Sequence, residues 1–127
     1  MKNIIIGALT LMTWLSSSTA LAHHSAVMFD FQNHKVVEGK VMEARFANPH
    51  MRLILEVTDE ERGTRNIEFE GHSRNNMVRQ GLLPELFAKD DVITIRIAPM
   101  RNGDDGGYVL GVRGPDGTEV GTITSAD

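Results

Sequence analysis

The sequence contains no cysteine and only one tryptophan. Without cysteine, no disulfide can stabilise the fold and no thiolate can hold a metal ion. The single tryptophan, Trp14, lies in the apolar N-terminal run, so the rest of the chain has none. Stability must therefore come mainly from a hydrophobic core of aliphatic side chains and a few phenylalanines.

Motifs of several enzyme and nucleic-acid-binding classes are also missing. The chain has no P-loop, no G-x-G-x-x-G, no nucleophile elbow and no H-E-x-x-H. Its 17 acidic residues outnumber its 13 basic residues, giving a net charge of −4. Nucleic-acid phosphates and anionic membranes attract clustered Lys and Arg. These observations argue against a nucleic-acid partner and favour a binding protein over an enzyme.

Residues 1–22 have the pattern of a secretion signal peptide. Lys2 precedes an apolar run from Ile4 to Leu15, and Ala20-Leu21-Ala22 matches an A-x-A cleavage site. The run is too short to cross a bilayer stably. We therefore expect cleavage after Ala22 and a periplasmic or secreted protein with no membrane span in its mature form.

The mature chain is expected to contain an N-terminal arm at 23–34 and one folded domain at 35–127. A long first strand at 35–47 changes its inward parity between Val41 and Met42, which indicates a bulge or sharp bend. A short helix is expected between the possible N-cap Ser73 and Gly81. Alternating hydrophobicity predicts further strands at 50–58, 65–70, 92–98, 108–113 and 118–123, with another helical turn at 83–87.

This order of elements predicts the fold class. A long bent strand, two further strands, a helix and then two or three strands match an all-β fold with one short helix, an OB-like antiparallel barrel of five to six strands. A simple meander with an extra helix is the alternative. The residues expected to face the core are Leu53, Leu55, Ile67, Phe69, Ile93, Ile95 and Ile97.

Several segments also resemble a known family. They are Ala22-His23-His24-Ser25 with Phe29-Asp30, Asn48-Pro49-His50, Glu68-Phe69-Glu70-Gly71, Arg79-Gln80-Gly81-Leu82, Gly103 with Gly106-Gly107, and Pro115-Asp116-Gly117. In this order they resemble the small exported bacterial proteins grouped as domain of unknown function 6152. Leu82, where that family is expected to have tryptophan, and His72 depart from the pattern. The resemblance implies a secreted, barrel-like domain and brings no established activity.

Histidine is the residue type that offers chemistry. Cleavage after Ala22 would give His23 a free α-amine beside its imidazole, and together with another imidazole these nitrogens suit Cu(II). His24 is a weaker candidate, because consecutive side chains diverge in an extended arm. The alternative is that the cleavage position leaves histidine first without any role.

His50 and His72 are the other candidate ligands. Pairing Leu55 with Phe69 in a hairpin places Arg52 opposite His72 and makes the two histidines diagonal neighbours, with about 7 Å between their backbones. They would then lie at one end of the barrel. The alternative is that each is an ordinary histidine at a loop edge.

Other residue types are less favoured as ligands. The methionines Met28, Met42, Met51 and Met77 could bind Cu(I), but methionine more often fills a core. Asp104-Asp105 lacks the spacing of a calcium loop. Glu68 with Glu70 could form an acid pair, and Arg52 with Arg74 could bind a small anion, although such residues are usually just solvated.

The sequence therefore predicts an exported small binding protein. The leading hypothesis is a transition-metal site, copper first, formed by His23, His50, His72 and, less favoured, His24. The first alternative is a metal-free accessory domain that binds a small molecule or an exported protein partner through the barrel face. A copper-dependent redox enzyme is the weaker alternative.

Overall fold

The structure is a computed structural model that describes residues 27–124. The expected signal peptide at 1–22, its cleavage site, and the candidate ligands His23 and His24 lie outside the described residues. No helix among the described residues is long and apolar enough to cross a membrane.

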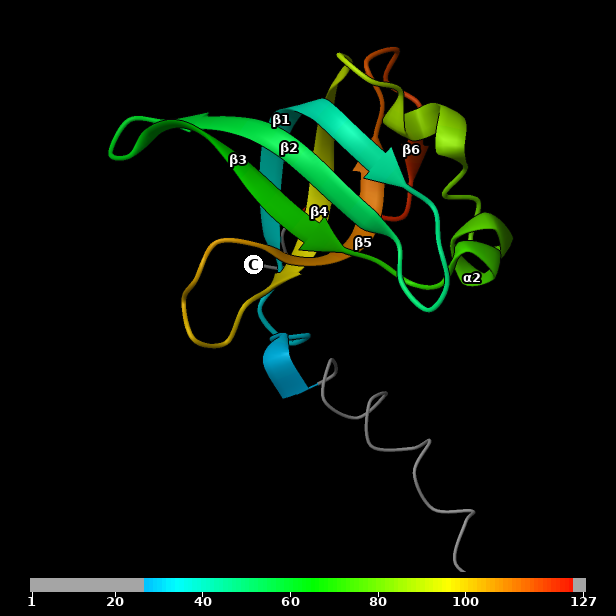
Figure 1. Ribbon diagram of the computed structural model, residues 1–127, viewed down its shortest axis with the longest axis horizontal. Coiled ribbons are helices and arrows are strands. Elements are labelled where there is room, and N and C mark those ends of the chain that lie inside the picture. Colours follow the sequence, from blue (N-terminus) through cyan, green and yellow to red (C-terminus); the bar gives the residue numbers. More distant parts are fainter. Residues whose placement is uncertain (1–26, 125–127) are drawn as a thin grey trace, which may run out of the picture.

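Five strands close into a barrel, and a sixth short strand extends the sheet. The strand order is β3-β2-β1-β4-β5-β6, and an additional β3–β5 pairing closes the barrel (Figure 1). This arrangement confirms the predicted all-β, OB-like barrel. The elements are β1 (Lys35–Arg45), β2 (Arg52–Asp59), β3 (Gly63–Glu70), α2 (Arg74–Arg79), the 3-10 helix η1 (Pro84–Phe87), β4 (Val92–Pro99), β5 (Gly107–Arg113) and β6 (Glu119–Val120).

Strand β1 serves both sides of the barrel, as its change of phase predicts. Its first half pairs with β4 and its second half with β2, and the two pairings meet at Lys40. A register shift between Val41 and Glu43 marks the expected bulge. Gly39 allows a close approach here, because a Cβ at this position would lie 2.8 Å from the Glu56 carbonyl oxygen. The bend in β1 therefore depends on both the bulge and the absence of a Cβ at Gly39.

The predicted register of the β2–β3 hairpin is wrong by two residues. Leu55 pairs with Ile67 rather than with Phe69, and Arg52 pairs with Glu70 rather than with His72. The turn is tighter than expected, because Asp59 pairs directly with Gly63. Asp59 Oδ1 accepts backbone N–H bonds from Glu61 and Arg62, at 3.1 and 2.6 Å, and Gly63 adopts a φ of +69°. A three-residue loop with a left-handed glycine is a common hairpin connection.

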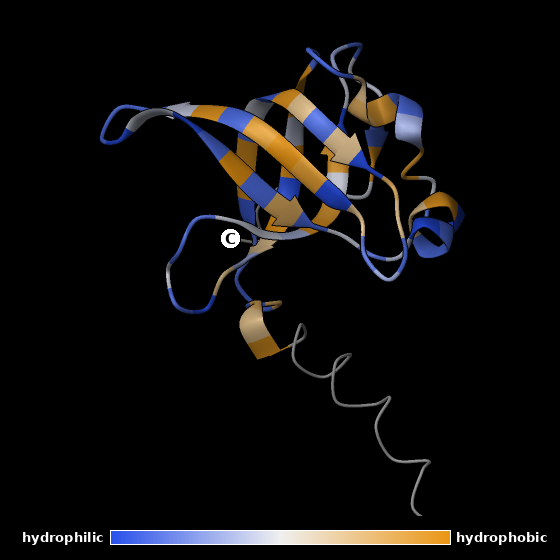
Figure 2. Ribbon diagram, viewed as in Figure 1, coloured by the Kyte–Doolittle hydropathy of each residue, from blue (hydrophilic) through white to orange (hydrophobic). Residues whose placement is uncertain are grey.

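The core contains all the side chains expected to face it, since the seven predicted residues of β2, β3 and β4 are buried. Apolar and polar residues alternate along these strands (Figure 2). Met51 and Met77 are fully buried, which confirms them as core residues. The segment of α2 and η1 contributes Met77, Leu82 and Phe87 to the same core. The Phe46 and Phe87 rings lie 5.6 Å apart, so this segment covers the barrel where β1 ends.

The short helix and the last strand differ in detail from expectation. Ser73 occupies the N-cap position of α2 but makes no side-chain capping bond. Gly81 follows the helix with the expected positive φ, +80°. The strand expected at 118–123 is limited to two residues, because Gly121 turns the chain with a φ of +73° and Ile123 is then buried separately.

Candidate functional site

The arm that precedes β1 is attached to the barrel by its backbone and by an aromatic side chain. Asp30 N–H donates to the Pro99 carbonyl at 2.8 Å, and Arg101 N–H donates to the Met28 carbonyl at 2.9 Å. Phe29 is buried against Ala98 and Tyr108. The rings of Phe29 and Phe31 each lie 5.4 Å from the Tyr108 ring. The arm is therefore fixed beside Tyr108 at the start of β5.

The β3–β5 pairing brings the candidate histidines close to this tyrosine. A single parallel pair, Glu70 with Tyr108, closes the barrel. His50 contacts Glu70, and the His72 ring lies 5.7 Å from the Tyr108 ring in an edge-to-face arrangement. We call His50, Glu70, His72 and Tyr108 the seam cluster. Glu70 is the last residue of β3 and His72 follows it, whereas His50 precedes β2 and Tyr108 lies at the start of β5.

His50 is oriented by two hydrogen-bond acceptors. Its Nδ1 lies 3.1 Å from Glu70 Oε1 and 3.3 Å from the Gly71 carbonyl oxygen. Both partners only accept, so Nδ1 carries the proton in the neutral ring and Nε2 keeps its lone pair. Metal-binding histidines typically show this arrangement, in which the second nitrogen donates to a carboxylate or a carbonyl. The His50 side chain is 35% exposed.

His72 is placed by an irregular backbone pairing. Met51 N–H donates to the His72 carbonyl, whereas Gly71 N–H donates to the Met51 carbonyl, both at 2.9 Å. Gly71 and His72 thus both pair with Met51 on the neighbouring segment, which is the pattern of a bulge. His72 is exposed, and its Nδ1 lies 3.4 Å from Asn76 Nδ2 at the start of α2. His50 and His72 therefore lie on adjacent segments that are joined through Met51.

Tyr108 keeps its proton over a wide pH range. Burial raises its pKa to about 12, and the nearby Glu70 carboxylate acts in the same direction. Sequence reasoning missed this residue as part of the site. Its only signal was that it is the sole tyrosine of the chain, at the start of a strand. Glu70 was considered only as half of an acid pair with Glu68, which instead forms an ion pair with Arg52.

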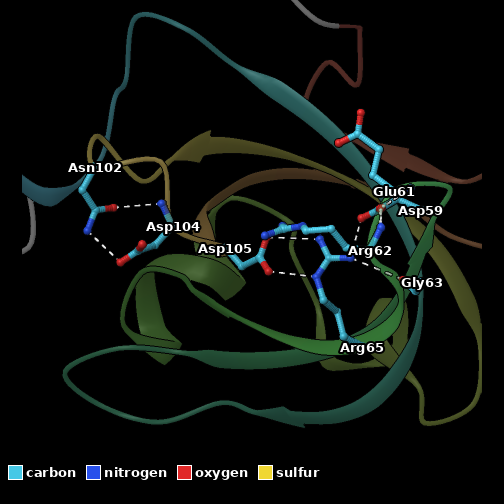
Figure 3. Close-up of polar contacts among 8 residues, drawn as sticks. All are labelled: Asp59, Glu61, Arg62, Gly63, Arg65, Asn102, Asp104 and Asp105. Carbon is cyan, nitrogen blue, oxygen red and sulfur yellow. Dashed lines mark hydrogen bonds and ion pairs between the residues drawn. The ribbon is translucent and has the colours of Figure 1, made fainter.

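The structure therefore places His50 and His72 on adjacent segments. Within residues 27–124, no group of three or more His, Asp or Glu residues could hold a metal ion. Of the residues in the alternative sites, Arg52 forms an ion pair with Glu68. Asp105 of the acidic loop forms ion pairs with Arg62 and Arg65 (Figure 3).

A comparison with curated proteins finds no match to this chain. One family matches over residues 12–109, which include β1 to β4, the seam cluster and the start of β5. It is described as a family of unknown function, DUF6152. The barrel and the match over most of the chain lead to one conclusion: the protein belongs to the DUF6152 family.

Proposed function

We propose that this protein is exported, is cleaved after Ala22, and binds Cu(II) at the seam cluster. The ligands are the amine and imidazole of His23 together with Nε2 of His50 or an imidazole nitrogen of His72. His24 is the less favoured fourth candidate. The observation that carries the proposal is the hydrogen bonding of His50, whose Nδ1 faces two acceptors and leaves Nε2 for a metal.

The distance along the chain is compatible with this ligand set. The arm is held against Tyr108 through Phe29, and His72 packs on the same tyrosine ring. Five residues lie between His23 and Phe29, and an extended chain over these six residue steps spans at most about 20 Å. The Tyr108 ring lies between Phe29 of the arm and His72. The proposal requires that the amino terminus of the mature chain reach His72 or His50.

Copper is favoured over other metals by the type and number of ligands. The proposed set consists of an amine and neutral imidazoles, with no thiolate because the chain has no cysteine. Such nitrogen ligands suit Cu(II), which also binds most tightly of the divalent first-row metals. Calcium and magnesium prefer oxygen ligands instead. Export is part of the proposal, because only cleavage after Ala22 creates the amine of His23.

The experiment compares copper binding by matched histidine variants of the mature protein. We expect His50→Ala to weaken Cu(II) binding, and Glu70→Gln to weaken it by roughly tenfold, because the carboxylate orients the ligand. His34→Ala is the control, since the His34 Nε2 contacts the Phe31 carbonyl within the arm. Titration with electron paramagnetic resonance reports the nitrogen ligands. Equal affinity in the His50→Ala, His72→Ala and His34→Ala variants would contradict the proposal.

A metal-free role remains the alternative proposal. An accessory domain would bind a small molecule or an exported protein through the barrel. The structure contains a cleft away from the seam histidines that suits a small molecule, and its chemistry is taken up below.

A further inference from the structure

A cleft of about 720 Å3 opens in the barrel on the side of the β2–β3 turn. It lies between the first half of β1, the end of β2, the beginning of β3 and the β4–β5 loop at 103–106. Sites for small organic ligands typically have volumes of about 300–1,000 Å3. None of the four residues of the seam cluster lines this cleft. It is therefore a second candidate site, separate from the proposed copper site.

The cleft has an apolar floor and a charged rim. Ile67, Phe69 and Ile97 line it from the core. On the inward face of β2 and β3, the positions next to the core residues are charged. They are Asp59 on β2 and Arg65 on β3, and both lie at the rim of the cleft. An amphipathic ligand, with an apolar body and a charged group, matches this division.

Arg65 is the central member of the charged rim (Figure 3). Its Nε donates to Asp105 Oδ2 at 2.8 Å and its Nη2 donates to Asp105 Oδ1 at 3.2 Å. Its Nη1 forms an ion pair with Asp59. The Arg65 side chain is 24% exposed, compared with 39% for Asp59 and 35% for Asp105. A guanidinium held in this way binds one carboxylate through two parallel bonds, which is the arrangement arginine uses to recognise carboxylate ligands.

The two carboxylates on Arg65 differ in how firmly they are fixed. Asp59 ends β2 and also accepts the backbone N–H groups of Glu61 and Arg62, so it belongs to the hairpin turn. Asp105 lies in a loop between Gly103 and Gly106, both with positive φ. Among the described residues, the side-chain bonds from this loop to the β2–β3 hairpin all end on Asp105. Asp105 is therefore the carboxylate that a ligand can replace.

We propose that the cleft binds a small amphipathic carboxylate, whose carboxylate replaces that of Asp105 on Arg65 while its apolar part lies against Val37 and Val57 above the buried floor. Asp105 then acts as an internal occupant that competes with the ligand. The ligand carboxylate then neutralises Arg65, and Asp105 leaves Arg65 but keeps Arg62 as a partner.

The test uses octanoate and octan-1-ol as probes, which share an alkyl chain and differ in the carboxylate. Isothermal titration calorimetry should detect octanoate binding to the wild type and weaker binding of octan-1-ol. Asp105→Ala should bind octanoate on the order of tenfold more tightly, because hydrogen bonds to a charged group contribute at least that much. Arg65→Gln should lose the preference for octanoate over the alcohol.

Two further variants keep the test decisive. Arg113→Gln removes an arginine that pairs with Glu119 outside the cleft, and it should bind octanoate as the wild type does. Asp105→Asn replaces Asp105→Ala if the latter does not fold. Octanoate binding that is equal in the wild type, Arg65→Gln and Asp105 variants would overturn the proposal. Binding of neither probe by the wild type and the Asp105 variants would overturn it as well.

Discussion

Phe69 is one of the largest fully buried side chains, with 1% of its surface exposed, and it pairs with Leu53 across the β2–β3 hairpin. Removing the ring leaves a cavity that neighbouring strands can fill only in part. Phe69→Ala should therefore lower the free energy of unfolding by about 3–5 kcal/mol. Urea denaturation measures this change.

The control for the core substitution is Phe31→Ala, because Phe31 is 40% exposed on the arm. It should shift the urea midpoint much less than Phe69→Ala does. Equal shifts in the two variants would show that the inward face of β3 is assigned wrongly.

The ionisation of Tyr108 gives a second prediction at the scale of one residue. Burial raises its pKa from 10.0 to about 12, so the folded protein favours the neutral phenol. A raised pKa contributes stability that is present below the unfolded value and is lost as pH rises through the folded value. Stability should therefore fall between pH 10 and 12.

Tyrosinate absorbance can be assigned directly, because the chain has a single tyrosine. The folded protein should titrate near pH 12, and the protein unfolded in urea near 10. Glu70→Gln should move the folded midpoint slightly downward, since the Glu70 carboxylate disfavours the tyrosinate. A folded midpoint at the unfolded value would contradict the buried position of Tyr108.

At the scale of elements, strand parity was predictable and strand register was not. Leu53, Leu55 and Ile67 alternate with polar residues, so their side of the sheet follows from the sequence. A shift of two residues keeps the same side chains inside, and parity therefore cannot distinguish the two registers. The register depends on the tight turn that Asp59 stabilises and on the positive φ of Gly63.

The side-chain environment of the seam cluster was also beyond sequence reasoning. His50 and His72 were identified, but Glu70 and Tyr108 meet only because β3 and β5, distant in sequence, close the barrel. The bulge at Gly71 and His72 has no hydrophobic signature that a pattern could reveal. Contacts of this kind are set by the closure of the whole sheet rather than by local sequence.

The contact between the β4–β5 loop and the β2–β3 hairpin should depend on pH. A hydrogen bond from Arg65 holds the pKa of Asp105 below its usual value of 3.8, and the backbone N–H of Arg62 does the same for Asp59. A lowered pKa contributes stability that is present above the unfolded value and is lost as pH falls through the folded value. The melting temperature of the wild type should therefore exceed that of Asp105→Asn at neutral pH.

This difference in melting temperature should shrink as the pH falls below 3.8. Asp104→Asn serves as the control, because Asp104 bonds to Asn102 within the loop and leaves both ion pairs of Asp105 intact. A difference between the wild type and Asp105→Asn that stays constant from neutral to acidic pH would contradict the proposed ion-pair contact.

At the scale of the whole molecule, the barrel holds two candidate sites in different places. The seam cluster lies where β3 meets β5, beside the arm that leads to the amino terminus. The cleft lies beside the β2–β3 turn and the β4–β5 loop. The proposed copper binding at the seam requires a processed amino terminus, whereas the proposed carboxylate binding in the cleft does not. Variants in one site should therefore leave binding at the other unchanged.

The copper proposal is tested most directly by changing the amino terminus alone. The exported protein should have the intact mass of residues 23–127, and it should bind Cu(II) with several nitrogen ligands. A Gly-Ser extension before His23 keeps every side chain but removes the free amine from His23. Copper titration with electron paramagnetic resonance should show much weaker binding by the extended protein. Equal affinity and equal spectra for the native and extended proteins would contradict the proposed site.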